Sequence, residues 1–138
     1  MFSEIGSTLA TIAWHFGPRG LNGECCEDLS MPEFIALDKV SATRNCSVQE
    51  VGRSLGFSKS GATRVVNRLG KKGYIKKLKS REDGRVCCIE PTDKGREMLR
   101  MADLRYQQQF EALLSRFPSE SRQKIKEVFF RVAGAVKE

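Results

Sequence analysis

Residues 58–73 have the sequence SKSGATRVVNRLGKKG, which carries the clearest structural pattern in the chain. Ser58 is a typical helix N-cap, because its side-chain oxygen can accept a hydrogen bond from a free backbone N–H of the first turn. Three apolar residues at i, i+1 and i+4 form a stripe on one side of the helix that follows: Val65, Val66 and Leu69. The rest of its surface is polar or basic: Lys59, Ser60, Thr63, Arg64, Asn67 and Arg68. The pattern predicts a helix over 59–70 with one buried face and one exposed face.

Two further helices are expected before this one. Ser30 with Glu33, and Ser47 with Glu50, have the spacing of a capping box, in which a side chain at each end accepts a hydrogen bond from the other's backbone N–H. The helices so predicted span 30–41 and 48–55. The glycine at position 56 ends the second of them and leaves only a tight turn before Ser58.

The pattern changes after Gly73, where two strand-like runs, 74–79 and 85–90, flank the sequence Arg-Glu-Asp-Gly at 81–84. Asp-Gly is a strong hairpin signal, because a type I′ turn needs a positive φ at both central residues. Thr92 follows the ribbon and is a good N-cap for the next helix. We therefore expect a basic β-hairpin directly after the 59–70 helix.

This order of elements predicts a winged helix-turn-helix of the mainly α (α+β) class, in which the helix after the turn enters the major groove of DNA. Serine, threonine and asparagine can hydrogen-bond to base edges or phosphates, and arginine can reach guanine or the backbone. The charge distribution agrees. The segment 53–85 holds eleven Lys or Arg against two acids, a charge of +9, whereas the whole chain carries +7. Such a segment favours binding to phosphates through the release of counterions, although a solvated basic face would look the same.

The terminal regions carry apolar stripes of their own. In residues 2–16 apolar side chains recur at steps of three and four, and similar stripes follow in 93–117 and after Ser119. A helix over 93–117 would be about 38 Å long, against a radius of gyration of about 14 Å for a chain of this size. We therefore expect a homodimer rather than a monomeric helical bundle. We expect one domain over 1–138, with a DNA-binding lobe at about 30–96 and dimerisation helices at about 1–29 and 97–138.

Three segments resemble the MarR family of transcriptional regulators. The stretch 58–75 is similar to that family's recognition helix and first wing strand, and 80–86 to its wing, including an Asp-x-Arg signature at Asp83 and Arg85. The Thr-x-x-Gly opening at Thr92 resembles the start of the family's next helix. The resemblance covers about residues 29–97, and the flanking helices match in layout only.

The resemblance implies a homodimeric regulator, a repressor more often than an activator, that binds a pseudo-palindromic operator in double-stranded DNA and responds to an effector such as a small molecule. It places Ser60, Thr63 and Arg64 at the major groove and phosphates, and Arg85, oriented by Asp83, in the minor groove. A narrow minor groove concentrates negative potential and attracts an inserted arginine. The candidate DNA-binding residues from the helix, its cap and the wing are Ser58, Lys59, Ser60, Thr63, Arg64, Asn67, Arg68, Lys79, Arg81, Asp83 and Arg85. Gly61 departs from good helix composition, and either allows close approach of the backbone to DNA or costs stability.

The five cysteines form no C-x-x-C motif, so a structural zinc site, or any metal or cofactor, is not expected. Cys87 and Cys88 should point to opposite faces of a strand and serve as small buried hydrophobes. Cys25 and Cys26 are the possible sensor, because the resemblance to the MarR family includes members that sense oxidants or metals through residues near the corresponding loop. The acids around them should raise the pKa of both thiols, which favours an inert pair. A thiol- or metal-responsive regulator stays open as an alternative.

Composition and motifs limit the remaining function classes. Of the 138 residues, 40% are hydrophobic and 30% charged, and no apolar run is long enough to cross a membrane, so we expect a cytoplasmic protein. A cysteine nucleophile with His15 as its base would define an enzyme, but no catalytic motif accompanies it. A winged helix used only to dock another protein is the more serious alternative. The basic helix and wing oppose it, because the cores of protein interfaces are depleted in charge.

Overall fold

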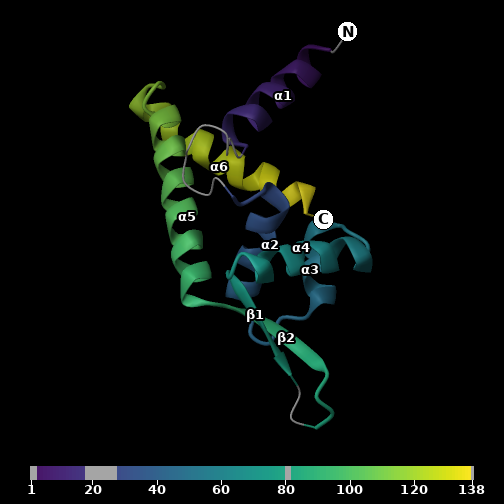
Figure 1. Cartoon of the computed structure of the whole chain (residues 1–138). Coiled ribbons are helices and arrows are strands. Elements are labelled where there is room, and N and C mark those ends of the chain that lie inside the picture. The colour runs from purple at the N-terminus through teal and green to yellow at the C-terminus, as the bar shows by residue number, and fades with distance from the viewer. Residues whose placement is uncertain (1–2, 18–27, 80–81, 138) are drawn as a thin grey trace. The chain divides into compact units, whose positions relative to one another are not determined.

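The computed structural model describes residues 3–17, 28–79 and 82–137. The elements follow in the order α1 (Glu4–Phe16), α2 (Met31–Ala42), α3 (Val48–Leu55), α4 (Lys59–Lys71), β1 (Ile75–Lys79), β2 (Val86–Pro91), α5 (Asp93–Leu114) and α6 (Ser119–Val136) (Figure 1). Two compact units make up the chain, residues 1–103 and 104–138. The mainly helical winged fold expected from the sequence is confirmed.

Side-chain caps start all three helices of the lobe. Ser58 Oγ accepts from the backbone N–H of Gly61 at 3.2 Å, and α3 begins with the complete capping box of Ser47 and Glu50. In α2, Ser30 accepts from the N–H of Glu33 as expected. The carboxylate of Glu33, however, accepts from Lys72 Nζ at 2.6 Å, so the reciprocal half of the predicted box is replaced by an ion pair with the end of α4.

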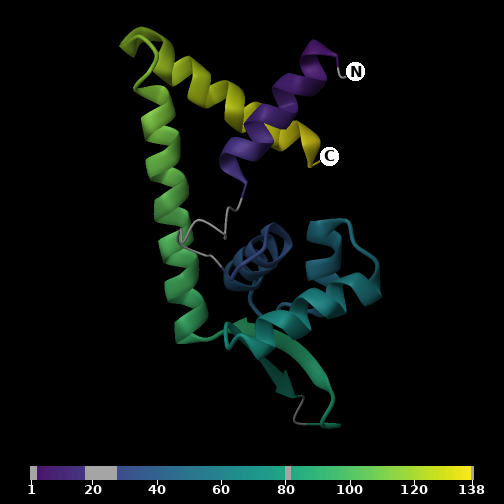
Figure 2. The ribbon, with the colours of Figure 1, turned by 45° about the horizontal axis from the view of Figure 1, so that its top comes forward.

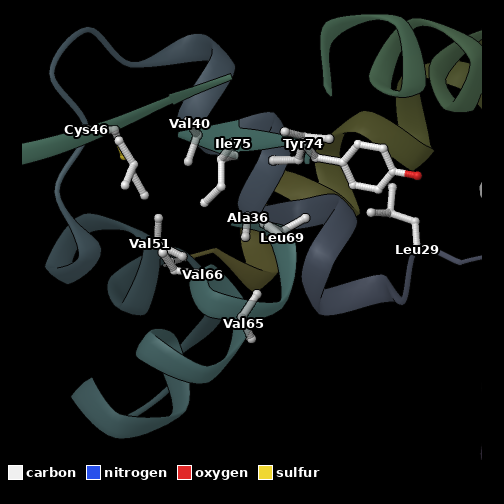
Figure 3. Packing of buried hydrophobic residues seen from close by; sticks show 12 residues of the cluster. Leu29, Ala36, Val40, Cys46, Val51, Val65, Val66, Leu69, Tyr74 and Ile75 are labelled. Atoms are coloured by element: carbon white, nitrogen blue, oxygen red, sulfur yellow. The ribbon is translucent and has the colours of Figure 1, made fainter. Parts of the chain in front are cut away.

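The core of the lobe lies between α2, α3, α4 and the root of the hairpin (Figure 3). The apolar stripe predicted for α4 is fully buried, as Val65, Val66 and Leu69 show. Gly52 of α3 and Ala62 of α4 meet at the crossing of these helices, where a Cβ on Gly52 would lie 3.3 Å from that of Ala62. This close crossing fixes the direction in which α4 presents its other face.

The hairpin projects away from the three helices (Figures 1 and 2). β1 and β2 pair antiparallel from Ile75 with Pro91 to Lys79 with Val86, with a register shift after Leu78. The predicted type I′ turn is wrong, because Gly84 has a φ of +71° but Asp83 does not have a positive φ. The shift at the end of β1 leaves more residues in the connection than a two-residue turn holds. On the other edge of β2, Ile89 N–H donates to the carbonyl of Cys46 at 2.8 Å and joins the sheet to the start of α3.

α5 starts against the root of the hairpin. Thr92 caps the helix by accepting from the N–H of Gly95 at 3.0 Å, and its hydroxyl donates to the carbonyl of Gly73 at 2.5 Å. A Cβ on Gly95 would overlap the Tyr74 carbonyl, because it would lie 2.9 Å from the carbonyl carbon. The Thr-x-x-Gly opening is therefore a packing requirement of this junction.

In the second unit the last part of α5 is followed by α6. α5 ends at Leu114, three residues before the end predicted from periodicity, and a turn over 115–117 leads into Pro118. The rings of Phe110 and Phe129 pack edge to face with centroids 5.1 Å apart. None of the helices in the described parts of the chain is long and apolar enough to cross a membrane.

Candidate nucleic-acid interface

The outer face of α4 carries every residue that the sequence predicted for it. All of these side chains are exposed: Ser58, Lys59, Ser60, Thr63, Arg64, Asn67 and Arg68. The opposite face, from Ala62 to Leu69, is buried. α4 is thus anchored by one side and offers a continuous polar and basic surface on the other, which is the arrangement a groove-binding helix requires.

Internal hydrogen bonds already use some of the polar atoms on this face. Thr63 Oγ1 donates to the carbonyl of Lys59 at 2.8 Å, and the hydroxyls of Ser58 and Ser60 lie 3.2 Å apart. With its proton given to the helix backbone, Thr63 offers outward only an acceptor lone pair and a methyl group. These four residues line a shallow surface depression over the first turn of α4.

Gly61 faces Phe57 rather than the outer surface of α4. A Cβ at this position would lie 3.4 Å from the Cβ of Phe57 and 3.4 Å from Oγ of the capping Ser58. Both distances are close to ordinary van der Waals contact, so packing against Phe57 does not by itself require glycine at this position.

In the wing, Asp83 and Arg85 contact each other twice. Asp83 Oδ1 accepts from the backbone N–H of Arg85 at 3.0 Å, and Oδ2 lies 3.8 Å from Arg85 Nε. The side chain of Arg85 is 87% exposed, so the pair presents the guanidinium to solvent. Lys79, at the end of β1, is exposed as well. Arg81 lies outside the residues that the structure describes.

Several lysines of the basic segment bond within the lobe. Lys76 pairs with Glu90 across the hairpin at 3.1 Å, and Lys77 Nζ donates to Asn67 Oδ1 at 2.9 Å. Lys72 is bonded to Glu33, as described above. The charge of +9 counted from the sequence therefore overstates the charge left for phosphates. The role of Lys77 was missed, although its position two residues after the buried Ile75 places it on the same strand face.

A polar network fixes the end of α4 against its neighbours. Lys72 Nζ donates to the backbone carbonyl of Asp28 as well as to Glu33, whose side chain is only 4% exposed. The Tyr74 hydroxyl donates to the carboxylate of Asp28, with distances of 2.8 and 3.0 Å to its two oxygens. Lys94 Nζ donates to the carbonyl of Lys72 and lies 5.0 Å from the centre of the Tyr74 ring. The network joins α2, α4, the hairpin root and α5.

The structure describes the side chains of two of the cysteines, Cys46 and Cys88, and both are buried. Cys46 and Cys88 are free thiols in the core, and burial, with a smaller contribution from Glu50, raises the pKa of the Cys46 thiol. A raised pKa disfavours the thiolate, which is the nucleophile and metal ligand. Cys88 is the small buried hydrophobe that the sequence predicted. The possible sensor pair Cys25 and Cys26 lies outside the described residues.

The chain is similar to known proteins both in sequence and in fold. Residues 27–86 match the model of the MarR family. The transcriptional repressor MprA of Escherichia coli is 38% identical over 69 residues, which are 49% of this chain and 39% of MprA. Among solved structures, Streptococcus pneumoniae FabT in complex with DNA has a TM-score of 0.78 at 21% identity, covering 96% of this chain and 95% of FabT. The PcaV regulator from Streptomyces coelicolor in complex with its natural ligand has a TM-score of 0.68 at 22% identity, covering 96% and 93%.

The fold and the exposed helix-and-wing surface define the class of this protein as a winged helix-turn-helix protein. Residues 27–86, which hold the helix-turn-helix and most of the wing, match the MarR family. The match to MprA spans less than half of that protein's length, and the two structural neighbours show the fold.

Proposed function

We propose that the protein is a sequence-specific transcriptional regulator that binds operator DNA as a homodimer. In this proposal α4 enters the major groove and the hairpin lies over the adjacent minor groove, where Arg85 is inserted. Two copies related by a two-fold axis would bind a pseudo-palindromic site, because operator symmetry mirrors protein symmetry.

The observation that carries the proposal is the outer face of α4. It combines small hydrogen-bonding side chains with arginines, it is fully exposed, and its helix is anchored by a buried apolar stripe. A docking surface for a protein would be expected to have an apolar centre, and this face has none. The relation to the repressor MprA, and the similarity of the fold to FabT, which was solved on DNA, agree with this choice.

The terminal helices support the homodimer. In α1, Ile5 is 65% exposed and Leu9 60%. In α6, Phe130 is 68% exposed and Val136 77%. Apolar surface of this extent on two helices is what an obligate dimer would bury. Sedimentation of the full chain should give a dimer at micromolar concentration, and a monomer, with or without DNA, would contradict the proposal.

The proposed regulator changes its affinity for DNA when it binds an effector. The family relation favours repression, as the name of MprA illustrates, and the PcaV structure with its natural ligand favours a small molecule. A thiol- or metal-dependent response through Cys25 and Cys26 is the alternative. Both would appear as loss of DNA affinity on addition of the corresponding compound.

The direct test is binding to a fluorescent duplex library at several salt concentrations. The proposal expects enrichment of a sequence with two related half-sites, and an affinity that falls steeply with salt, because each neutralised phosphate releases counterions. Equal affinity for all duplexes, or none, would refute the proposed function. Footprinting on the DNA upstream of the protein's own gene would then locate an operator.

A further inference from the structure

One hydrogen bond joins the recognition helix to the wing. Lys77 Nζ of β1 donates to Oδ1 of Asn67 on α4 at 2.9 Å. An ammonium group can only donate, so the atom of the Asn67 amide that faces it must be the oxygen.

The positions of both residues in the fold bring them together. Lys77 pairs across the hairpin with Ile89, and cross-strand partners share one face of a sheet. Ile89 and Ile75 are buried, so Lys77 lies on the face that packs toward the helices. Asn67 follows Thr63 by one helical turn on the outer face of α4. Lys77 therefore reaches Oδ1 of Asn67 from the side of the hairpin.

This bond limits what Asn67 can offer to a base. Asparagine recognises adenine through two bonds, in which Oδ1 accepts from N6–H and Nδ2 donates to N7. The bond from Lys77 uses one of the two lone pairs of Oδ1 and places a positive ammonium group, which can only donate, beside the other. A donor such as N6–H is disfavoured there, and a base that presents acceptors is favoured. Guanine is the base with two acceptors, N7 and O6, in the major groove.

We propose that Lys77 sets the base preference of Asn67, so that the pair selects guanine over adenine at the base that Asn67 contacts. This inference rests on the proposed function and adds to it a preference at one position of the operator. It assigns to Lys77, a wing residue, a part in reading the major groove.

The experiment is selection of bound sequences from a randomised duplex library, followed by competition binding, with the wild type and three variants. Asn67→Ala identifies the base position, because the preference there is lost. At that position the wild type should favour guanine over adenine by roughly fivefold or more. Lys77→Met frees Oδ1 and should move the preference to adenine.

Lys76→Met is the matched control. It removes the same single charge from the neighbouring residue of β1, whose partner is Glu90 on the other face of the hairpin. It should weaken binding to all sequences to a similar extent and keep the preference for guanine. A general loss of charge and a change in base selection are thereby separated.

Three results would overturn the inference: a wild-type preference for adenine at the Asn67-dependent position, an unchanged preference in Lys77→Met, or no position that depends on Asn67. Failure of the proposed function looks different, because the wild type would then enrich no sequence at all. In that case the inference falls with it.

Discussion

The carboxylate of Asp83 binds Arg85 through both of its oxygens, one on the backbone N–H at 3.0 Å and the other 3.8 Å from Nε. Such a contact orients the arginine but, at this exposure, adds little to stability. Its value would lie in presenting the guanidinium to a groove.

Arg85→Ala should weaken operator binding by about 1–3 kcal/mol, as expected for one lost specific contact. Asp83→Ala should cost less, because Asp83 is expected to act through Arg85. The double variant should then resemble Arg85→Ala alone. A binding cycle of the four proteins at one salt concentration measures this. Strictly additive losses would show that Asp83 acts independently, and an unchanged Arg85→Ala would remove the wing from the interface.

Arg64→Ala tests the phosphate contacts of α4. Loss of a phosphate contact should weaken binding to all duplexes alike and lower the slope of log K against log salt by about 1. Arg100→Ala is a suitable control, because this arginine is exposed on α5 and pairs with Glu97 of the same helix. Titrations at several salt concentrations should leave the control slope close to wild type. An unchanged slope for Arg64→Ala would take that residue out of the DNA contact.

Gly95→Ala should destabilise the lobe by about 1–3 kcal/mol, the usual cost of overpacking, because the new methyl group meets the Tyr74 carbonyl. Gly70→Ala is the matched comparison within α4. Nothing lies within 4 Å of its Cβ position, so it should raise stability by about 0.5–1 kcal/mol through helix propensity. Urea unfolding of both variants decides the matter, and equal stability of Gly95→Ala and the wild type would contradict the packing at this junction.

Glu50 gives the lobe a predictable response to acid. The hydrogen bond from the Ser47 backbone N–H is the main cause that lowers the pKa of Glu50. Because the pKa is lower in the folded state, the carboxylate stabilises the fold above its ordinary pKa of about 4.3, and this contribution is lost as the pH falls through the folded value. Glu50→Gln should therefore be less stable than the wild type at neutral pH and approach it in acid. A stability difference that does not change with pH would refute this.

Local signals in the sequence predicted much of the fold. The caps at Ser47 and Ser58, the apolar stripe of α4 and the stop at Gly56 each depend on residues within one or two turns, so spacing alone locates them. The type I′ turn was wrong because the register shift after Leu78 is a property of the paired strands and leaves no mark near Asp83. The end of α5 was overestimated because apolar spacing continues through Phe117 after the helical hydrogen bonds have ended.

The candidate site was predicted by residue type but not by its internal bonding. The exposed face of α4 follows from helical periodicity, which needs no tertiary information. The hydrogen-bond partners of Lys72 and Lys77 do not follow from periodicity. Lys72 binds Glu33, which is 39 residues away in the sequence, and Lys77 binds Asn67, which lies on a different element. The contact between Gly61 and Phe57 could not be predicted either, because it forms only once the turn before α4 is folded.

The junction at the start of α5 also has a mechanical consequence. Thr92 and Lys94 bond to the backbone of Gly73 and Lys72, and Gly95 rests on Tyr74, so the first turn of α5 cannot rotate without carrying the end of α4. A displacement of that turn would therefore be passed on both to the end of α4 and to the residue before β1.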